Sequence, residues 1–131
     1  MAGVNRHTLQ PMANFPHALQ SVEVIFITRL FSRVMRRGFG GGLAELLGRL
    51  MTAGLMGLFK QLLATSIDLW EPRFRVRRVS FRGSADEVRL GRAGVSVEVD
   101  WRPNALLDDF TVHGTRLFTI MAQDTVTVAA A

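Results

Sequence analysis

The 131-residue sequence contains no cysteine, so neither disulfide bonds nor thiol chemistry can contribute to its fold or function. Histidine is scarce, and the three that occur, His7, His17 and His113, are too far apart for a local metal-binding motif. We therefore expect no metal and no cofactor.

An uncharged hydrophobic run long enough to cross a membrane is also missing. The most apolar stretch, residues 43–70, is interrupted by four charged residues, which are Glu45, Arg49, Lys60 and Asp68. Charged side chains are costly in hydrocarbon, so we interpret the stretch as two core-facing helices, at about 43–51 and 53–70. Thr52 is a suitable N-cap for the second one.

Lysine occurs once, at Lys60, so arginine supplies all the other basic residues of a chain with net charge +5. Guanidinium groups bind the phosphates of nucleic acids and the carboxylates of acidic protein partners. The arginines cluster locally, at 33–37 and 73–78, and do not form a basic tail. Composition alone leaves both kinds of partner open.

A catalytic group of residues is not evident either. Glu98 and Asp100 stand at (i, i+2) on one face of a predicted strand, which is typical of solvated charges. Ser80 and Ser96 have no histidine near them in the sequence. We therefore expect a protein that is not an enzyme.

The N-terminal half carries helical signals. Residues 1–16 contain Pro11 and Pro16 with polar residues between them, and we expect an extended arm. From His17 to about Ser32, apolar residues recur at helical spacing on more than one face, which predicts a largely buried helix.

A glycine-rich segment, residues 38–42, follows this helix. It lacks both the preceding strand and the lysine–serine or lysine–threonine pair of a phosphate-binding loop. We interpret it as a turn that Phe39 anchors in the core.

The segment from Leu69 to Phe74 separates the helical half from the strand half. Pro72 has no N–H and biases Glu71 away from the α region, so the helix is expected to end there. Glu71 and Arg73 then place opposite charges on a stiff corner, where we expect both to be exposed. Such a corner suits a fixed contact with a partner, although a helix stop with solvated charges is the favoured interpretation from these residues alone.

The strand after Pro72 changes phase, because its apolar residues switch faces between Val76 and Val79. We predict a β-bulge or bend near Arg77 and Arg78, since a one-residue slip moves every following side chain to the other face.

The clearest strand signal covers residues 95–101. The residues expected to face the core are Val95, Val97, Val99 and Trp101. Those expected to face outward are Ser96, Glu98, Asp100 and Arg102. We expect the two outward carboxylates to pair across the sheet with Arg89 or Arg75. A short strand from Val88 to Leu90 is expected to precede this one.

These elements predict an α+β fold in which N-terminal helices pack on a small, mostly antiparallel sheet. Residues 1–16 would form the arm, residues 17–121 a single domain and residues 122–131 a C-terminal tail. The last strand, Thr115 to Met121, is expected at the sheet edge, and Ala129 to Ala131 are expected to be frayed.

Three motifs at characteristic distances resemble a known family. They are Ser32-Arg33-Val34-Met35-Arg36-Arg37, Phe39-Gly40 and Trp70-Glu71-Pro72-Arg73. Together they resemble the baseplate wedge and sheath-initiator family of contractile phage tails, which is related to TssE of type VI secretion. The arm, with Gly3-Val4-Asn5-Arg6-His7-Thr8, is similar to the branch of P2-like phages, baseplate assembly protein W. The chain departs from the family at Leu9 and at Leu30-Phe31-Ser32, where the family has smaller residues.

The resemblance implies a structural protein that joins wedge proteins to the tube-proximal sheath and nucleates sheath assembly. Its partners would be other wedge proteins, sheath subunits and tail tube or hub proteins, without a membrane or a specific nucleic acid. Several copies would lie in the tail baseplate of a virion or a tailocin-like particle assembled in the bacterial cytoplasm. The implied partner-binding residues are Glu71, Pro72, Arg73, Arg33, Arg36 and Arg37. Arg73 would bind a partner carboxylate with two hydrogen bonds.

The alternative is a small basic module that binds nucleic acid. Its phosphate track would consist of Arg73, Arg75, Arg77 and Arg78. This alternative is weakened because the strand pattern splits these arginines between two faces and places no exposed aromatic platform between them.

Overall fold

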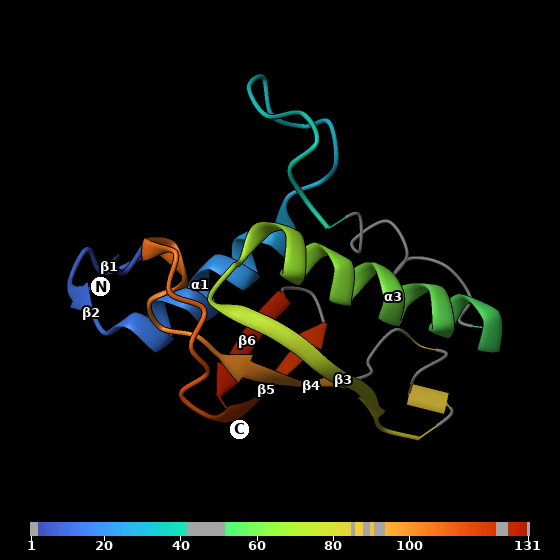
Figure 1. Cartoon of the computed structure of the whole chain (residues 1–131). Helices are drawn as coiled ribbons and strands as arrows, with labels where there is room; N and C mark the ends of the chain where they lie inside the picture. Colours follow the sequence, from blue (N-terminus) through green and yellow to red (C-terminus); the bar gives the residue numbers. More distant parts are fainter. Residues whose placement is uncertain are drawn as a thin grey trace.

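The computed structural model describes residues 3–41, 52–84, 86–87, 90, 94–122 and 126–130. These described residues include the helices α1 (Asn14–Ile27) and α3 (Ala53–Trp70), and a 3₁₀ turn η1 (Ala105–Leu107). A hairpin pairs β1 (Gly3–Val4) with β2 (Pro11–Met12), and a four-stranded antiparallel sheet has the order β3 (Phe74–Arg82), β4 (Gly94–Trp101), β5 (Thr115–Ala122), β6 (Val126–Ala130). The predicted α+β class is confirmed, with both helices on one face of the sheet (Figure 1). The helix predicted at 43–51 lies outside the described residues.

Helix α3 begins and ends where the sequence predicts. The Thr52 side chain accepts a hydrogen bond from the Leu55 N–H at 3.3 Å, as an N-cap does. At the other end the Glu71 N–H still donates to the Ile67 carbonyl, but Pro72 prevents a further turn. The buried residues Phe59, Leu63 and Ile67 recur every four positions and face the core.

Helix α1 begins at Asn14, three residues before the predicted start, so part of the expected arm is helical. Pro16 fits because it lies in the first turn, where backbone N–H groups have no partner within the helix. The helix ends at Ile27, earlier than the predicted end near Ser32. It is buried along one face only, whereas the sequence predicted a largely buried helix. Residues 3–12 form the β1–β2 hairpin.

The predicted bulge in β3 is confirmed. The register between β3 and β4 shifts between Val76 and Arg78. Because of this shift, Val76 pairs with Val99 and Val79 pairs with Val97, so the apolar residues before and after the bulge face the same core.

Strand β4 is buried on both faces at most positions. The four residues predicted to face the core are buried, as expected: Val95, Val97, Val99 and Trp101. Ser96 and Asp100 have less solvent exposure than expected for outward-facing residues; the Asp100 carboxylate is covered by Arg77 and Thr115, which both contact it. Asp100 pairs with Arg77 rather than with Arg75, since the bulge adds Arg77 beside it.

The C-terminal part differs from the prediction. Residues Val126–Ala130 form β6, in which Ala129 pairs with Thr119 and Ala130 with Phe118, so the expectation of a frayed end is wrong for these two alanines. Strand β5 is therefore not at the edge of the sheet. Leu90 lies in a turn rather than in the short strand predicted there; Val88 and Arg89 are outside the described residues.

The core lies between the helices and the sheet. Phe74 and Phe118 are fully buried, with ring centroids 5.6 Å apart. Trp101 contacts Phe74 and Phe15, each at 5.2 Å. This aromatic group ties the first turn of α1 to three strands.

Candidate functional site

The corner at residues 71–73 is an internal ion pair. Arg73 Nε donates to Glu71 Oε1 at 2.7 Å and Arg73 Nη2 donates to Oε2 at 2.9 Å, so the guanidinium and the carboxylate meet through two parallel bonds. Each residue is only 2% exposed. The expectation that both charges are exposed is therefore wrong. Pro72 turns the chain between the end of α3 and the start of β3, which brings the two side chains together.

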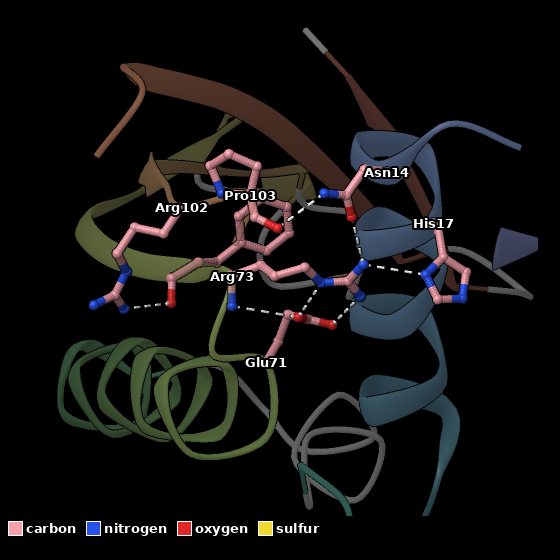
Figure 2. Close-up of polar contacts among 7 residues, drawn as sticks. Asn14, His17, Glu71, Arg73, Arg102 and Pro103 are labelled. Carbon is pink, nitrogen blue, oxygen red and sulfur yellow. Dashed lines mark hydrogen bonds and ion pairs between the residues drawn. The ribbon is translucent and has the colours of Figure 1, made fainter. Parts of the chain in front are cut away.

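The remaining donors of Arg73 are directed at helix α1 (Figure 2). Nη1 donates to Asn14 Oδ1 at 2.9 Å and lies 3.1 Å from His17 Nδ1. A guanidinium only donates, so His17 Nδ1 is the acceptor and its ring proton lies on Nε2. Asn14 and His17 were not predicted as site residues. Their only signal was a pair of polar residues at (i, i+3), which share one helix face.

Backbone groups extend this network to the sheet. The Asn14 amide donates to the Pro103 carbonyl at 3.0 Å, and the Arg102 N–H donates to the Arg73 carbonyl at 2.8 Å. We call Asn14, His17, Glu71 and Arg73 the corner cluster. It connects α1, the end of α3, the start of β3 and the segment after β4. Its charges are compensated by specific partners, as buried charges must be.

The β1–β2 hairpin closes over the corner cluster. A Cβ at Gly3 would overlap the ring of His17, so the backbone of β1 lies directly against the imidazole. Gln20 fixes the hairpin on α1, because its side chain accepts from the Arg6 N–H and donates to the Val4 carbonyl. The cluster is therefore shielded from solvent on this side.

The other predicted partner-binding residues, Arg33, Arg36 and Arg37, lie on one segment, residues 28–41, which we call the arginine loop. It projects from the domain in Figure 1, and all three arginines are exposed. None of them belongs to the corner cluster. At the base of the loop, the Arg33 guanidinium lies 4.1 Å from the Phe39 ring centroid, and Phe39 packs edge-on against Trp70 at 5.0 Å.

Arg73, Arg75, Arg77 and Arg78 do not form the continuous phosphate track of the nucleic-acid alternative. Arg73 is buried in the corner cluster and is not accessible to a phosphate. The bulge places Arg75 and Arg78 opposite Asp100 and Glu98, on one face, so the predicted split between faces is wrong for these two.

Asp100 binds one of the remaining β3 arginines. Arg77 Nε lies 2.6 Å from Asp100 Oδ1. The hydrogen bond from Arg77 is the main cause that lowers the pKa of Asp100, and the same bond raises the pKa of Arg77. Arg77 is therefore engaged within the sheet rather than free for a phosphate.

Within the part of the chain that the structure describes, no three His, Asp or Glu side chains come together as a metal site. Of the described helices, none is both long and apolar enough to cross a membrane. The arrangement therefore offers two polar features of different character: a closed internal cluster and an exposed basic loop.

Comparisons with known proteins give one matching family model and several similar structures. The family model described as baseplate wedge protein gp25 matches residues 17–105. The structure is similar to a chain of the pyocin R2 baseplate in its postcontracted state, with 29% identity, a TM-score of 0.64, and coverage of 77% of this chain and 98% of that chain. A comparison with curated proteins finds no match.

Two further solved structures share the fold. A chain of the anti-feeding prophage baseplate has 20% identity and a TM-score of 0.54, and the match covers 99% of this chain and 80% of that chain. A Geobacter sulfurreducens protein named a "putative tail lysozyme" has 23% identity and a TM-score of 0.61, over 86% of this chain and 94% of that chain. At these identities the likeness concerns the fold and carries no activity.

Proposed function

This chain belongs to the family of baseplate wedge protein gp25, and we propose that it joins wedge proteins to the tube-proximal sheath of a contractile tail and nucleates sheath assembly. In this proposal several copies lie in the baseplate of a phage or tailocin-like particle assembled in the bacterial cytoplasm. The role is structural rather than enzymatic, and tube or hub proteins are further partners.

The observation that carries the proposal is the free edge of β6. The sheet order places β6 at one end, and among the described residues no further strand pairs with it. Its sequence, Val126–Ala130, contains neither proline nor a charged residue, which are the usual features that protect an edge strand from pairing. A strand from a sheath subunit can add here through main-chain hydrogen bonds.

The opposite edge of the sheet is protected. Strand β3 carries Arg75, Arg77, Arg78 and Arg82, and charged side chains disfavour edge pairing. In addition, the Asp68 carboxylate accepts a hydrogen bond from the Val76 N–H at 3.0 Å, so a backbone donor of β3 is already used. Strand addition is therefore expected at β6.

The wedge contacts are assigned to the arginine loop. Arg33, Arg36 and Arg37 are exposed there, whereas the charges of Glu71 and Arg73 face inward. In this proposal the corner at Pro72 supports assembly indirectly, because the corner cluster sets the orientation of α1 and α3 relative to the sheet.

Two proline substitutions at adjacent positions test the β6 edge. Along an antiparallel edge strand, successive residues direct their N–H alternately to the neighbouring strand and to the free edge. Of Ala129→Pro and Ala130→Pro, one therefore removes a bond to β5 and the other removes an outward donor. The outward variant is expected to melt like the wild type yet to give tubes and baseplates without extended sheaths in electron micrographs.

The inward variant is the matched control, and it is expected to lower the melting temperature. Normal contractile tails from a strain whose only copy of the gene encodes the outward variant would contradict strand addition at β6.

A further inference from the structure

The tip of the arginine loop exposes large apolar side chains. Val34 is 91% exposed, Met35 84% and Phe31 75%. Exposed apolar residues are common when they are scattered singly, but these three stand within five positions on one projecting loop (Figure 1).

The backbone of this loop is held in an unusual conformation. Phe31 has φ 63° and Arg36 has φ 55°, a region that a bulky residue rarely adopts. Hydrogen bonds within the loop hold this geometry: the Phe31 N–H donates to the Arg37 carbonyl at 2.9 Å, and the Ser32 hydroxyl donates to the Arg29 carbonyl at 2.7 Å. Strained residues persist only where the surrounding contacts enforce them, and they concentrate at functional sites.

The base of the loop is closed against the domain. The Gly41 N–H donates to the Ile25 carbonyl at 3.0 Å, at the end of α1. Gly40 has φ 133°, and a Cβ there would lie 2.6 Å from the Thr28 carbonyl oxygen. Phe39 lies between Arg33 and Trp70. The tip is therefore presented by a fixed base, which lowers the entropy lost on binding.

The charge of the loop identifies the kind of partner. Residues 28–41 contain four arginines, Arg29, Arg33, Arg36 and Arg37, and no acidic residue. Arginine and large apolar residues together are typical of the buried centre of protein–protein interfaces, where guanidinium groups pair with carboxylates. A nucleic acid would complement the arginines but would leave Val34 and Met35 without an apolar partner.

We propose that the arginine loop is a preformed knob whose apolar tip, Phe31, Val34 and Met35, inserts into an apolar pocket with a rim of carboxylates on a neighbouring baseplate protein. This inference rests on the proposed function and adds to it the anchor residues and the chemistry of the partner surface.

The first test is the double variant Val34→Ser/Met35→Ser in a strain whose only copy of the gene carries it. Quantitative mass spectrometry of purified particles measures the amount of this chain relative to the tube protein. Loss of two anchors from an interface centre is expected to lower incorporation at least about 10-fold. Both side chains are exposed, so the melting temperature of the purified variant is expected to stay unchanged.

Leu107→Ser is the matched control, because Leu107 is 72% exposed at the end of η1, outside the arginine loop. It is expected to leave incorporation unchanged. Normal incorporation of the double variant, or an equal loss in both variants, would overturn the assignment of the tip. Absence of the wild-type chain from purified particles would instead overturn the proposed function itself.

A second test identifies the pocket directly. A photoreactive benzoylphenylalanine at position 34 is activated in assembled particles, and the crosslinked peptides are sequenced. The expected product joins position 34 to apolar residues next to Asp or Glu in another baseplate protein. Crosslinks to DNA or lipid, or no crosslink in particles that contain the substituted chain, would overturn the proposal.

Discussion

Arg73 and Glu71 face each other across Pro72 through two parallel hydrogen bonds, and both side chains are almost inaccessible to solvent. Removing one partner of a buried ion pair leaves the other charge without compensation, which is destabilising. The corner is therefore expected to matter for folding before it matters for assembly.

Arg73→Ala is expected to lower the free energy of unfolding by about 3–5 kcal/mol. Chemical denaturation of the purified chain measures the change. Arg75→Ala is the control, because Arg75 is exposed, and it is expected to change stability by less than about 0.5 kcal/mol. An Arg73→Ala variant that unfolds at the wild-type denaturant concentration would show that the pair contributes nothing.

Trp101→Ala is expected to cost about 3–5 kcal/mol, because the indole is 7% exposed and its removal opens a cavity beside Phe15 and Phe74. The measurement is again denaturant unfolding. Leu106→Ala, at a side chain that is 46% exposed, is the control and is expected to cost much less. Unchanged melting of Trp101→Ala would mean that β4 does not direct this residue into the core.

Gly40→Ala and Gly38→Ala form a matched pair in the arginine loop. Gly40 has φ 133° and no room for a Cβ, whereas nothing lies within 4 Å of a Cβ at Gly38. Gly40→Ala is expected to destabilise the chain by more than about 1 kcal/mol, and Gly38→Ala to be neutral or slightly stabilising. Thermal melts measure both effects, and equal melting temperatures would contradict the described loop base.

The Asp100–Arg77 pair predicts a pH dependence of stability. The pKa of Asp100 is lowered in the folded state, mainly by the hydrogen bond from Arg77, so the folded state favours the ionised carboxylate. The stabilisation is present above the ordinary value of 3.8 and is lost as pH falls through the lower folded value. Melts between about pH 2 and 6 are expected to show a smaller acid-induced loss in Asp100→Asn than in the wild type.

Arg77→Ala removes the same hydrogen bond from the other side. The acid-induced loss is expected to shrink in this variant as well. Identical pH profiles of the wild type and both variants would contradict the pair.

Binding to random DNA is expected to be weak at physiological salt, no tighter than about 10⁻⁴–10⁻⁶ M. Arg73 is buried and Arg77 is paired, so only Arg75 and Arg78 of the proposed phosphate track remain for phosphates. Fluorescence anisotropy over a range of salt concentrations measures the affinity. Submicromolar binding with a steep salt dependence would favour the nucleic-acid alternative.

Local features of the fold were predictable because each depends on neighbours in the chain. Thr52 and Pro72 mark the ends of α3 through their own hydrogen-bonding groups. The change of phase between Val76 and Val79 required a bulge, because strand side chains alternate with a period of two. The start of α1 was missed because Pro16 was interpreted as part of an extended arm, although proline is tolerated in a first helical turn.

The candidate site was predicted in its residues but not in its orientation. The sequence singled out Glu71, Pro72 and Arg73, yet nothing near them indicates whether the charges face solvent or the core. Asn14 and His17 decide this, and they precede Arg73 by 59 and 56 positions. Arg33, Arg36 and Arg37 lie on an exposed loop, and their role in partner binding stays a prediction.

The sequence by itself determined the α+β class, the end of α3 at Pro72, the bulge in β3 and the resemblance to baseplate wedge proteins, since periodicity, proline geometry and short motifs are properties of contiguous residues. Only the tertiary structure decided that the Glu71–Arg73 pair faces inward and that β6, rather than β5, forms the open edge. The physical reason is that burial and strand pairing depend on distant segments. A charge becomes internal only when another element supplies its hydrogen bonds, and a strand is an edge only when no other strand pairs beside it.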